Sequence, residues 1–99
     1  MNNSYDYLKE LKDFFEGTFH QDISSPEQAL DEFINEVSKE CLVSTINDCK
    51  EFLNSNLTRQ EKEDFIKVNT EIYFPAIELT PLQWLCKLVE QIQEAVKTK

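Results

Sequence analysis

The chain has 99 residues, of which 40% are hydrophobic and 11% aromatic, and its formal net charge at pH 7 is −9. This length predicts one domain with one core over residues 1–99, and the apolar share excludes a disordered chain. An acidic surface repels phosphate and attracts cations, so the composition argues against a nucleic-acid partner and favours a basic one.

The first predicted helix covers residues 4–16, with Leu8, Leu11 and Phe15 on one stripe. Gly17 follows it and is placed to end the helix in the left-handed conformation. The second predicted helix covers residues 26–37. Its apolar residues recur at the three-four spacing of one helix face, and its other face holds acids. These apolar residues are Leu30, Phe33, Ile34 and Val37.

A third helix is predicted over residues 40–52, and Asn54-Ser55-Asn56 would end it by competing for backbone hydrogen bonds. A shorter fourth helix starts at Thr58 and presents Phe65 and Val68 as its apolar residues. Pro75 then interrupts the pattern, because a proline disfavours the helical conformation of the residue before it, Phe74. The last helix is predicted over residues 81–96, again with apolar residues at three-four spacing.

Three helix starts share one signature, in which a hydroxyl residue is followed three positions later by Gln or Glu. Such a pair can form a capping box, and proline at the first helical position strengthens two of the three signals. The starts are Ser25-Pro26-Glu27-Gln28, Thr58-Arg59-Gln60-Glu61 and Thr80-Pro81-Leu82-Gln83. We therefore predict an all-α fold, a compact bundle of about five short helices.

Acidic residues are concentrated in residues 13–38, a stretch that contains no Lys or Arg. Its seven carboxylates belong to Asp13, Glu16, Asp22, Glu27, Asp31, Glu32 and Glu36. Pairs four apart on a helix repel each other weakly, which a cationic partner would relieve. The alternative is a solvated face that only keeps the protein soluble.

The sequence offers little material for catalysis, and we predict no enzyme, no cofactor and no metal site. There is one histidine, His20, and one glycine, which excludes the glycine-rich phosphate loops. The cysteines Cys41, Cys49 and Cys86 have no metal-ligand spacing, and we interpret them as reduced thiols that fill the core. No secretory signal or membrane span is visible, so we expect a cytoplasmic protein.

The connection between the first two helices contains Phe19-His20-Gln21-Asp22. Phe19 and Ile23 are expected to plug the gap between the helix ends. His20 and Asp22 would either form hydrogen bonds with the exposed backbone there or present a polar tip to a partner.

Together with Ser25-Pro26-Glu27, Tyr73-Phe74-Pro75 and Trp84-Leu85, this connection resembles the small helical immunity proteins of bacterial contact-dependent growth inhibition systems. Ile23 departs from the aromatic residue expected after Asp22.

The resemblance implies a cytosolic protein that binds and blocks the toxic C-terminal domain of an effector. Such toxins are often nucleases, whose cationic grooves would suit an acidic inhibitor. We expect a monomer that forms a one-to-one complex, with Tyr73 and Trp84 as candidate anchors, although a core position for Trp84 is the alternative. The charged part of the predicted surface consists of His20, Asp22, Glu27, Asp31, Glu32 and Glu36. A second hypothesis is a helical adaptor that binds a peptide or helix in an apolar groove.

Overall fold

The computed structural model of the chain describes residues 6–20 and 25–99, and this part contains six helices and no strand. The predicted all-α class is confirmed, and the five predicted helices are present, with their described ends at most two residues from the predicted ones. The predicted start of the first helix, at residues 4 and 5, and the predicted plug residue Ile23 lie outside the described residues. The helices are α1 (Asp6–Thr18), α2 (Pro26–Glu36), α3 (Lys39–Leu53), α4 (Arg59–Asn69), α5 (Phe74–Ile77) and α6 (Pro81–Thr98).

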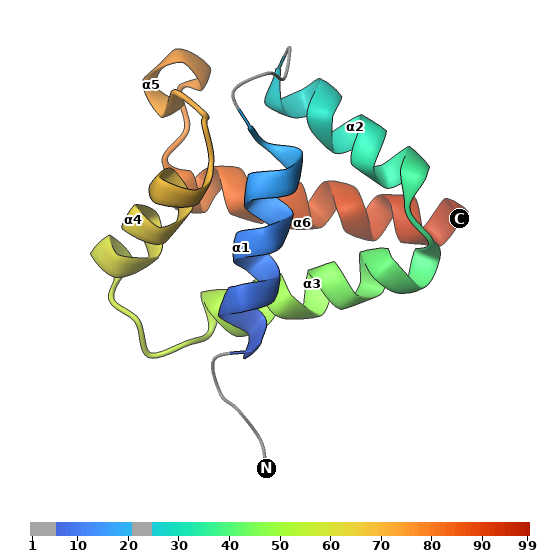
Figure 1. Ribbon diagram of the computed structural model, residues 1–99, viewed down its shortest axis with the longest axis horizontal. Helices are drawn as coiled ribbons and strands as arrows, with labels where there is room; N and C mark the ends of the chain where they lie inside the picture. Colours follow the sequence, from blue (N-terminus) through green and yellow to red (C-terminus); the bar gives the residue numbers. More distant parts are fainter. Residues whose placement is uncertain (1–5, 21–24) are drawn as a thin grey trace.

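The helices form two crossed layers, in which α1 runs across α3 and α6 (Figure 1). The short helix α4 packs against α1 and α6 on one side of the bundle, and α2 packs against the same two helices on the other side. No helix among the described residues is long and apolar enough to cross a membrane.

The core lies where α1, α3, α4 and α6 meet, and aromatic rings fill much of it. Trp84 of α6 is at its centre, with ring centroids 4.9 Å from Phe19, 5.7 Å from Phe74 and 6.0 Å from Phe15. Two of these contacts are edge-to-face, which is the favourable geometry for aromatic pairs. The core therefore joins α1, the connection after it, α5 and α6.

Two buried polar side chains at the end of α4 form hydrogen bonds with the turn that precedes them. The Thr70 hydroxyl donates to the carbonyl of Ile66 at 2.8 Å, and the Asn69 amide donates to that of Phe65 at 2.8 Å. Each bond removes the cost of burying a polar group without a partner. The end of α4 can therefore be buried beneath the segment that leads to α5.

Phe19 plugs the end of α1, as predicted. Its side chain is fully buried, and its N–H donates to Phe15 O at 2.8 Å. The Phe19 carbonyl accepts a hydrogen bond from Glu71 N–H at 2.8 Å, which ties this connection to the segment after α4. The prediction for Gly17 is wrong, because α1 continues through Thr18 and Gly17 has no positive φ. Continuing the helix carries Phe19 into the core.

Two of the three predicted capping boxes are present. Thr58 and Thr80 each accept a hydrogen bond from the N–H three residues on, and the Glu or Gln side chain there bonds back to the cap N–H. Ser25 makes only the first of these bonds, with Gln28 N–H at 3.1 Å. The Gln28 amide instead donates to Glu32 Oε2 at 3.3 Å.

The segment around Pro75 differs from the prediction. Phe74 is helical, as the first residue of α5, with Pro75 second, where the missing N–H removes no helix bond. Burial of the Phe74 ring against Trp84 holds this extra turn in place. Glu78 ends α5 in the left-handed conformation, with φ 57°.

Three apolar positions were also predicted wrongly. Cys41 and Cys86 are exposed, whereas Cys49 is buried as expected. Val68 is 79% exposed, and the neighbouring Ile66 takes the core position of α4 instead. Spacing along one helix predicts the centre of the buried stripe, but the neighbouring helices decide its edges.

Candidate partner-binding surface

The predicted surface is built on α2. Its inward face buries Ala29 and Leu30 fully and Phe33 and Ile34 in part. Phe33 packs against Phe14 of α1, with ring centroids 4.7 Å apart and the ring planes tilted by 60°. These contacts fix the rotation of the helix about its own axis, and therefore fix which residues point outward.

The four predicted carboxylates of α2 are all exposed on the outward side. Glu27 and Asp31 lie one turn apart and form one row, while Glu32 and Glu36 form a second row on the other edge of the same exposed face. Within the described part of the chain, none of the four makes a salt bridge with a lysine or arginine. The outward side of α2 therefore carries four carboxylates.

The acidic stretch is less uniform outside α2. Glu16 of α1 pairs with Lys12 at 3.1 Å, so the charge of this carboxylate is partly compensated within its own helix. The Asp64–Lys67 and Glu94–Lys97 salt bridges are also local and exposed, which makes each worth little in stability. Among the described carboxylates of residues 13–38, the four of α2 and Asp13 of α1 form no salt bridge.

The remaining predicted residues are not all brought to α2. His20 is exposed at the end of the connection from α1, and Asp22 lies outside the described residues. Tyr73 is 73% exposed just before α5. Trp84 is only 7% exposed and packs in the aromatic core, the alternative already considered for it. Tyr73 thus has contact area to offer, whereas Trp84 has little.

Among the described residues, Lys99 forms hydrogen bonds at the C-terminal end of α2. The ammonium group of Lys99 donates to the carbonyls of Ile34 and Val37, two acceptors at the end of the helix. Figure 1 shows the end of α6 beside the junction of α2 and α3. A cation at a helix C-terminus is favourable because the helix dipole is negative there. Lys99 therefore neutralises backbone carbonyls and leaves the acidic side chains unpaired.

A second acidic group, which the sequence did not reveal, lies between α1 and α3. Burial raises the pKa of Asp48 to about 6, and the nearby charges of Glu10 and Glu51 add to the effect. Burial also raises the pKa of Cys49 to about 12, so this thiol stays protonated in the core. Finding this group required knowing that α1 packs on α3, since the spacing of acids within α3 alone does not identify it.

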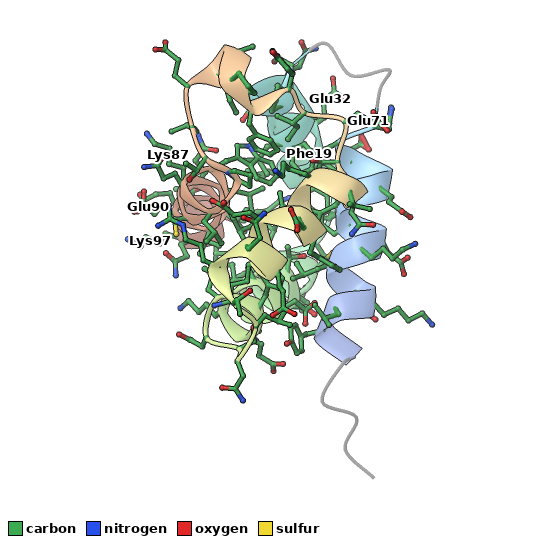
Figure 2. The ribbon with its side chains drawn as sticks, turned by 90° about the vertical axis from the view of Figure 1, so that its left-hand side faces the viewer. Phe19, Glu32, Glu71, Lys87, Glu90 and Lys97 are labelled. Atoms are coloured by element: carbon green, nitrogen blue, oxygen red, sulfur yellow. The ribbon has the colours of Figure 1, made fainter. Side chains whose placement is uncertain are left out.

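One hollow of about 410 Å³ adjoins the acidic helix, between the start of α2, α5 and α6. Its lining is mostly apolar, with Glu27 on the α2 side and Lys87 on the α6 side. Figure 2, which views α6 nearly end on, shows Lys87 projecting outward from α6 while Phe19 lies inside the bundle. No cluster of His, Cys, Asp and Glu suited to a metal ion occurs among the described residues.

The fold and surface together define a class, a small acidic helical protein whose distinctive feature is an exposed charged helix. A comparison with protein families gives a specific match, because residues 7–92 fit the family described as CdiI immunity protein. The chain belongs to this CdiI immunity protein family. No curated protein and no solved structure shows significant similarity to it.

Family membership indicates a protein that binds a cognate toxin domain of a contact-dependent growth inhibition system and neutralises it. Immunity proteins of this kind are generally not enzymes. The resemblance inferred from the connection after α1 and the Trp84-Leu85 pair is therefore confirmed at the level of the family.

Proposed function

We propose that this protein neutralises a cationic toxin domain, a nuclease, by binding it one-to-one in the cytoplasm as a monomer and without catalysis of its own. The supporting observation is the outward face of α2, where four exposed carboxylates have no lysine or arginine partner among the described residues. The proposed binding surface consists of these four acids with His20, Asp22 and Tyr73, and Trp84 supports it from the core.

The physical argument starts from the toxin. A nuclease holds its substrate through lysines and arginines that contact phosphate, and the same cations attract carboxylates. On α2, like charges four residues apart repel each other by about 0.2 to 0.5 kcal/mol per pair. A cationic groove placed against α2 would remove this repulsion and exclude nucleic acid at the same time. Inhibition then follows from occupation of the groove or of the surface beside it.

The first experiment is co-expression with the toxin domain encoded beside this protein. The proposed function predicts growth rescue, co-purification of the two chains, and loss of binding of a labelled RNA or DNA oligonucleotide to the inactivated toxin domain when the immunity protein is added. Absence of rescue and of co-purification would contradict the immunity function. Rescue with unchanged oligonucleotide binding would contradict coverage of the substrate groove.

Salt dependence separates this proposal from the adaptor hypothesis. Charge-driven association weakens steeply as ionic strength rises, whereas a helix bound in an apolar groove is held mainly by contacts that salt does not screen. Affinity for the toxin domain measured from low to physiological salt should fall strongly. An affinity independent of salt would favour the adaptor.

A further inference from the structure

The hollow beside α2 has the composition of an anchoring pocket. Its inner surface is formed by four side chains that are almost fully buried, and half-buried Ile77 and Leu79 form one wall. The four buried side chains are Phe19, Leu30, Trp84 and Leu88. A concave, mostly apolar site with few polar groups is typical of places where a binding partner inserts a side chain.

Its position connects it to the acidic helix. Ser25, Pro26 and Glu27, the cap and first turn of α2, form one edge of the hollow, so Glu27 belongs to both features. Asp31 lies one turn further along the same row. A partner that places cations on this row therefore has an apolar pocket directly beside its point of contact.

Three other hollows do not combine an apolar lining with the acids of α2. One is lined by Arg59, Lys62 and Lys87, and its cationic edge would repel a basic partner. Another lies beside Asn47 and Lys50 near the end of α3, and a third beside Phe74 and Pro75. None of the three includes a residue of α2. The requirement for an apolar lining next to the four acids of α2 thus selects the hollow between α2, α5 and α6.

We infer that this hollow receives an apolar side chain of the toxin domain, flanked in the toxin by a lysine or arginine that pairs with Glu27. The inference rests on the proposed function and adds the anchor that charge alone does not supply. Interfaces derive most of their affinity from a few desolvated side chains, while exposed charges mainly set the rate of encounter. A second copy of this chain fits poorly, because it would bring another net charge of −9 to an acidic edge.

The opposite charges on the two edges also orient the inserted segment. Glu27 stands on the α2 edge and Lys87 on the α6 edge, and the two do not form a salt bridge with each other. A cation of the partner is attracted to the first edge and repelled by the second. The segment should therefore enter with its lysine or arginine on the α2 side.

The test uses two neutral substitutions to tryptophan at exposed helix positions. Gln91→Trp places a large ring at the hollow, whereas Asn47→Trp places the same ring at the hollow near the end of α3. Neither changes the net charge. With the inactivated toxin domain as probe, Gln91→Trp should speed dissociation about tenfold or more, and Asn47→Trp should change it less than about twofold.

A second readout needs no substitution. Trp84 is the only tryptophan of the chain and lines the hollow, so its indole N–H signal in the isotope-labelled protein reports occupation by unlabelled toxin. We expect this signal to shift on binding. An unmoved Trp84 signal, or wild-type dissociation of Gln91→Trp, would overturn the inference even though the unsubstituted protein binds. If the unsubstituted protein does not bind at all, the proposed function itself fails.

Discussion

Helices α2 and α6 begin with nearly the same sequence and then serve different purposes. In both, a hydroxyl residue precedes a proline and accepts a hydrogen bond of 3.1 Å from the N–H of a glutamine three residues on. In α6 the side chain of Gln83 returns to the cap N–H at 3.0 Å, whereas in α2 the side chain of Gln28 turns outward to Glu32. The complete capping box therefore belongs to α6, the helix that contributes more buried residues to the core.

Helices α2 and α6 also differ in how many of their residues are buried. Six residues of α6 are buried, including Trp84 and Leu85, whereas α2 buries only Ala29 and Leu30. Lysines occur along α6 and are absent from α2. A start signal thus determines where a helix begins, while the composition of its faces determines whether it supports the fold or meets a partner. The comparison predicts that changes on the buried face of α6 mainly affect stability and that changes on the exposed face of α2 mainly affect binding.

The largest expected effect on stability is that of Trp84→Ala. Removing a buried aromatic ring from the centre of the core should lower the free energy of unfolding by about 3 to 5 kcal/mol. Leu30→Ala in α2 should cost less, about 2 to 3 kcal/mol, because it removes a smaller side chain from a helix that packs against fewer neighbouring helices. Urea denaturation followed by circular dichroism measures both. Equal losses would contradict the separation of a supporting helix from a binding helix.

Substitutions at the helix caps should change stability less, and they compare α6 with α2 more directly. Thr80→Ala removes the hydroxyl of a complete capping box and should lower the free energy of unfolding by about 1 to 2 kcal/mol. Ser25→Ala removes one hydrogen bond and should cost about 0.5 to 1 kcal/mol. Thermal melting of both variants beside the wild type provides the comparison. A greater loss for Ser25→Ala would show that α2 matters more to the fold than its burial indicates.

The smallest expected effect concerns Asp48 of α3, the helix on which α6 packs. Its pKa is raised from 3.8 to about 6, so the folded state releases this proton later than the unfolded state does. Ionising Asp48 therefore destabilises the folded state. This loss of stability is absent well below pH 4, grows as the pH rises to 6, and is complete above pH 6. Asp48→Asn should therefore raise stability at pH 7 by less than about 1 kcal/mol, since the group is largely solvated.

At pH 4 the same substitution should have a clearly smaller effect, because the folded state is then protonated and the unfolded state is only partly ionised. Urea denaturation of wild type and variant at pH 4 and pH 7 measures the difference. A gain of equal size at both pH values would show that Asp48 acts through packing rather than through its charge.

Much of the fold could be predicted from the sequence, because local signals determine it. The cap residues and the three-four spacing located five helices, and the size of Phe19 identified the plug after α1. The prediction that Gly17 ends the first helix is wrong because α1 must continue beyond it to bury Phe19, and the sequence around Gly17 does not show this. The exposed Cys41 and Cys86 lie on faces that neighbouring helices leave uncovered, which spacing alone does not reveal.

The candidate surface was predictable only in part. The acids of α2 could be placed on one exposed side from their spacing and from the apolar residues between them. The hollow could not be predicted, because its lining comes from three separate elements, with Leu30 in α2, Ile77 in α5 and Leu88 in α6. The raised pKa of Asp48 likewise depends on Glu10, which is distant in the sequence. Features made by packing between helices require the structure.

The most direct test of the acidic surface compares two matched charge reversals. Glu32→Lys with Glu36→Lys alters α2, and Glu90→Lys with Glu94→Lys alters two exposed acids with the same spacing on α6. Each pair changes the net charge from −9 to −5, so the variants have the same total charge at different positions. Of the four acids, Glu94 forms a salt bridge, with Lys97. Stopped-flow association with the toxin domain at low salt should slow about tenfold or more for the α2 pair and less than about threefold for the α6 pair. Equal slowing by both pairs would show that total charge, and not the face of α2, attracts the partner.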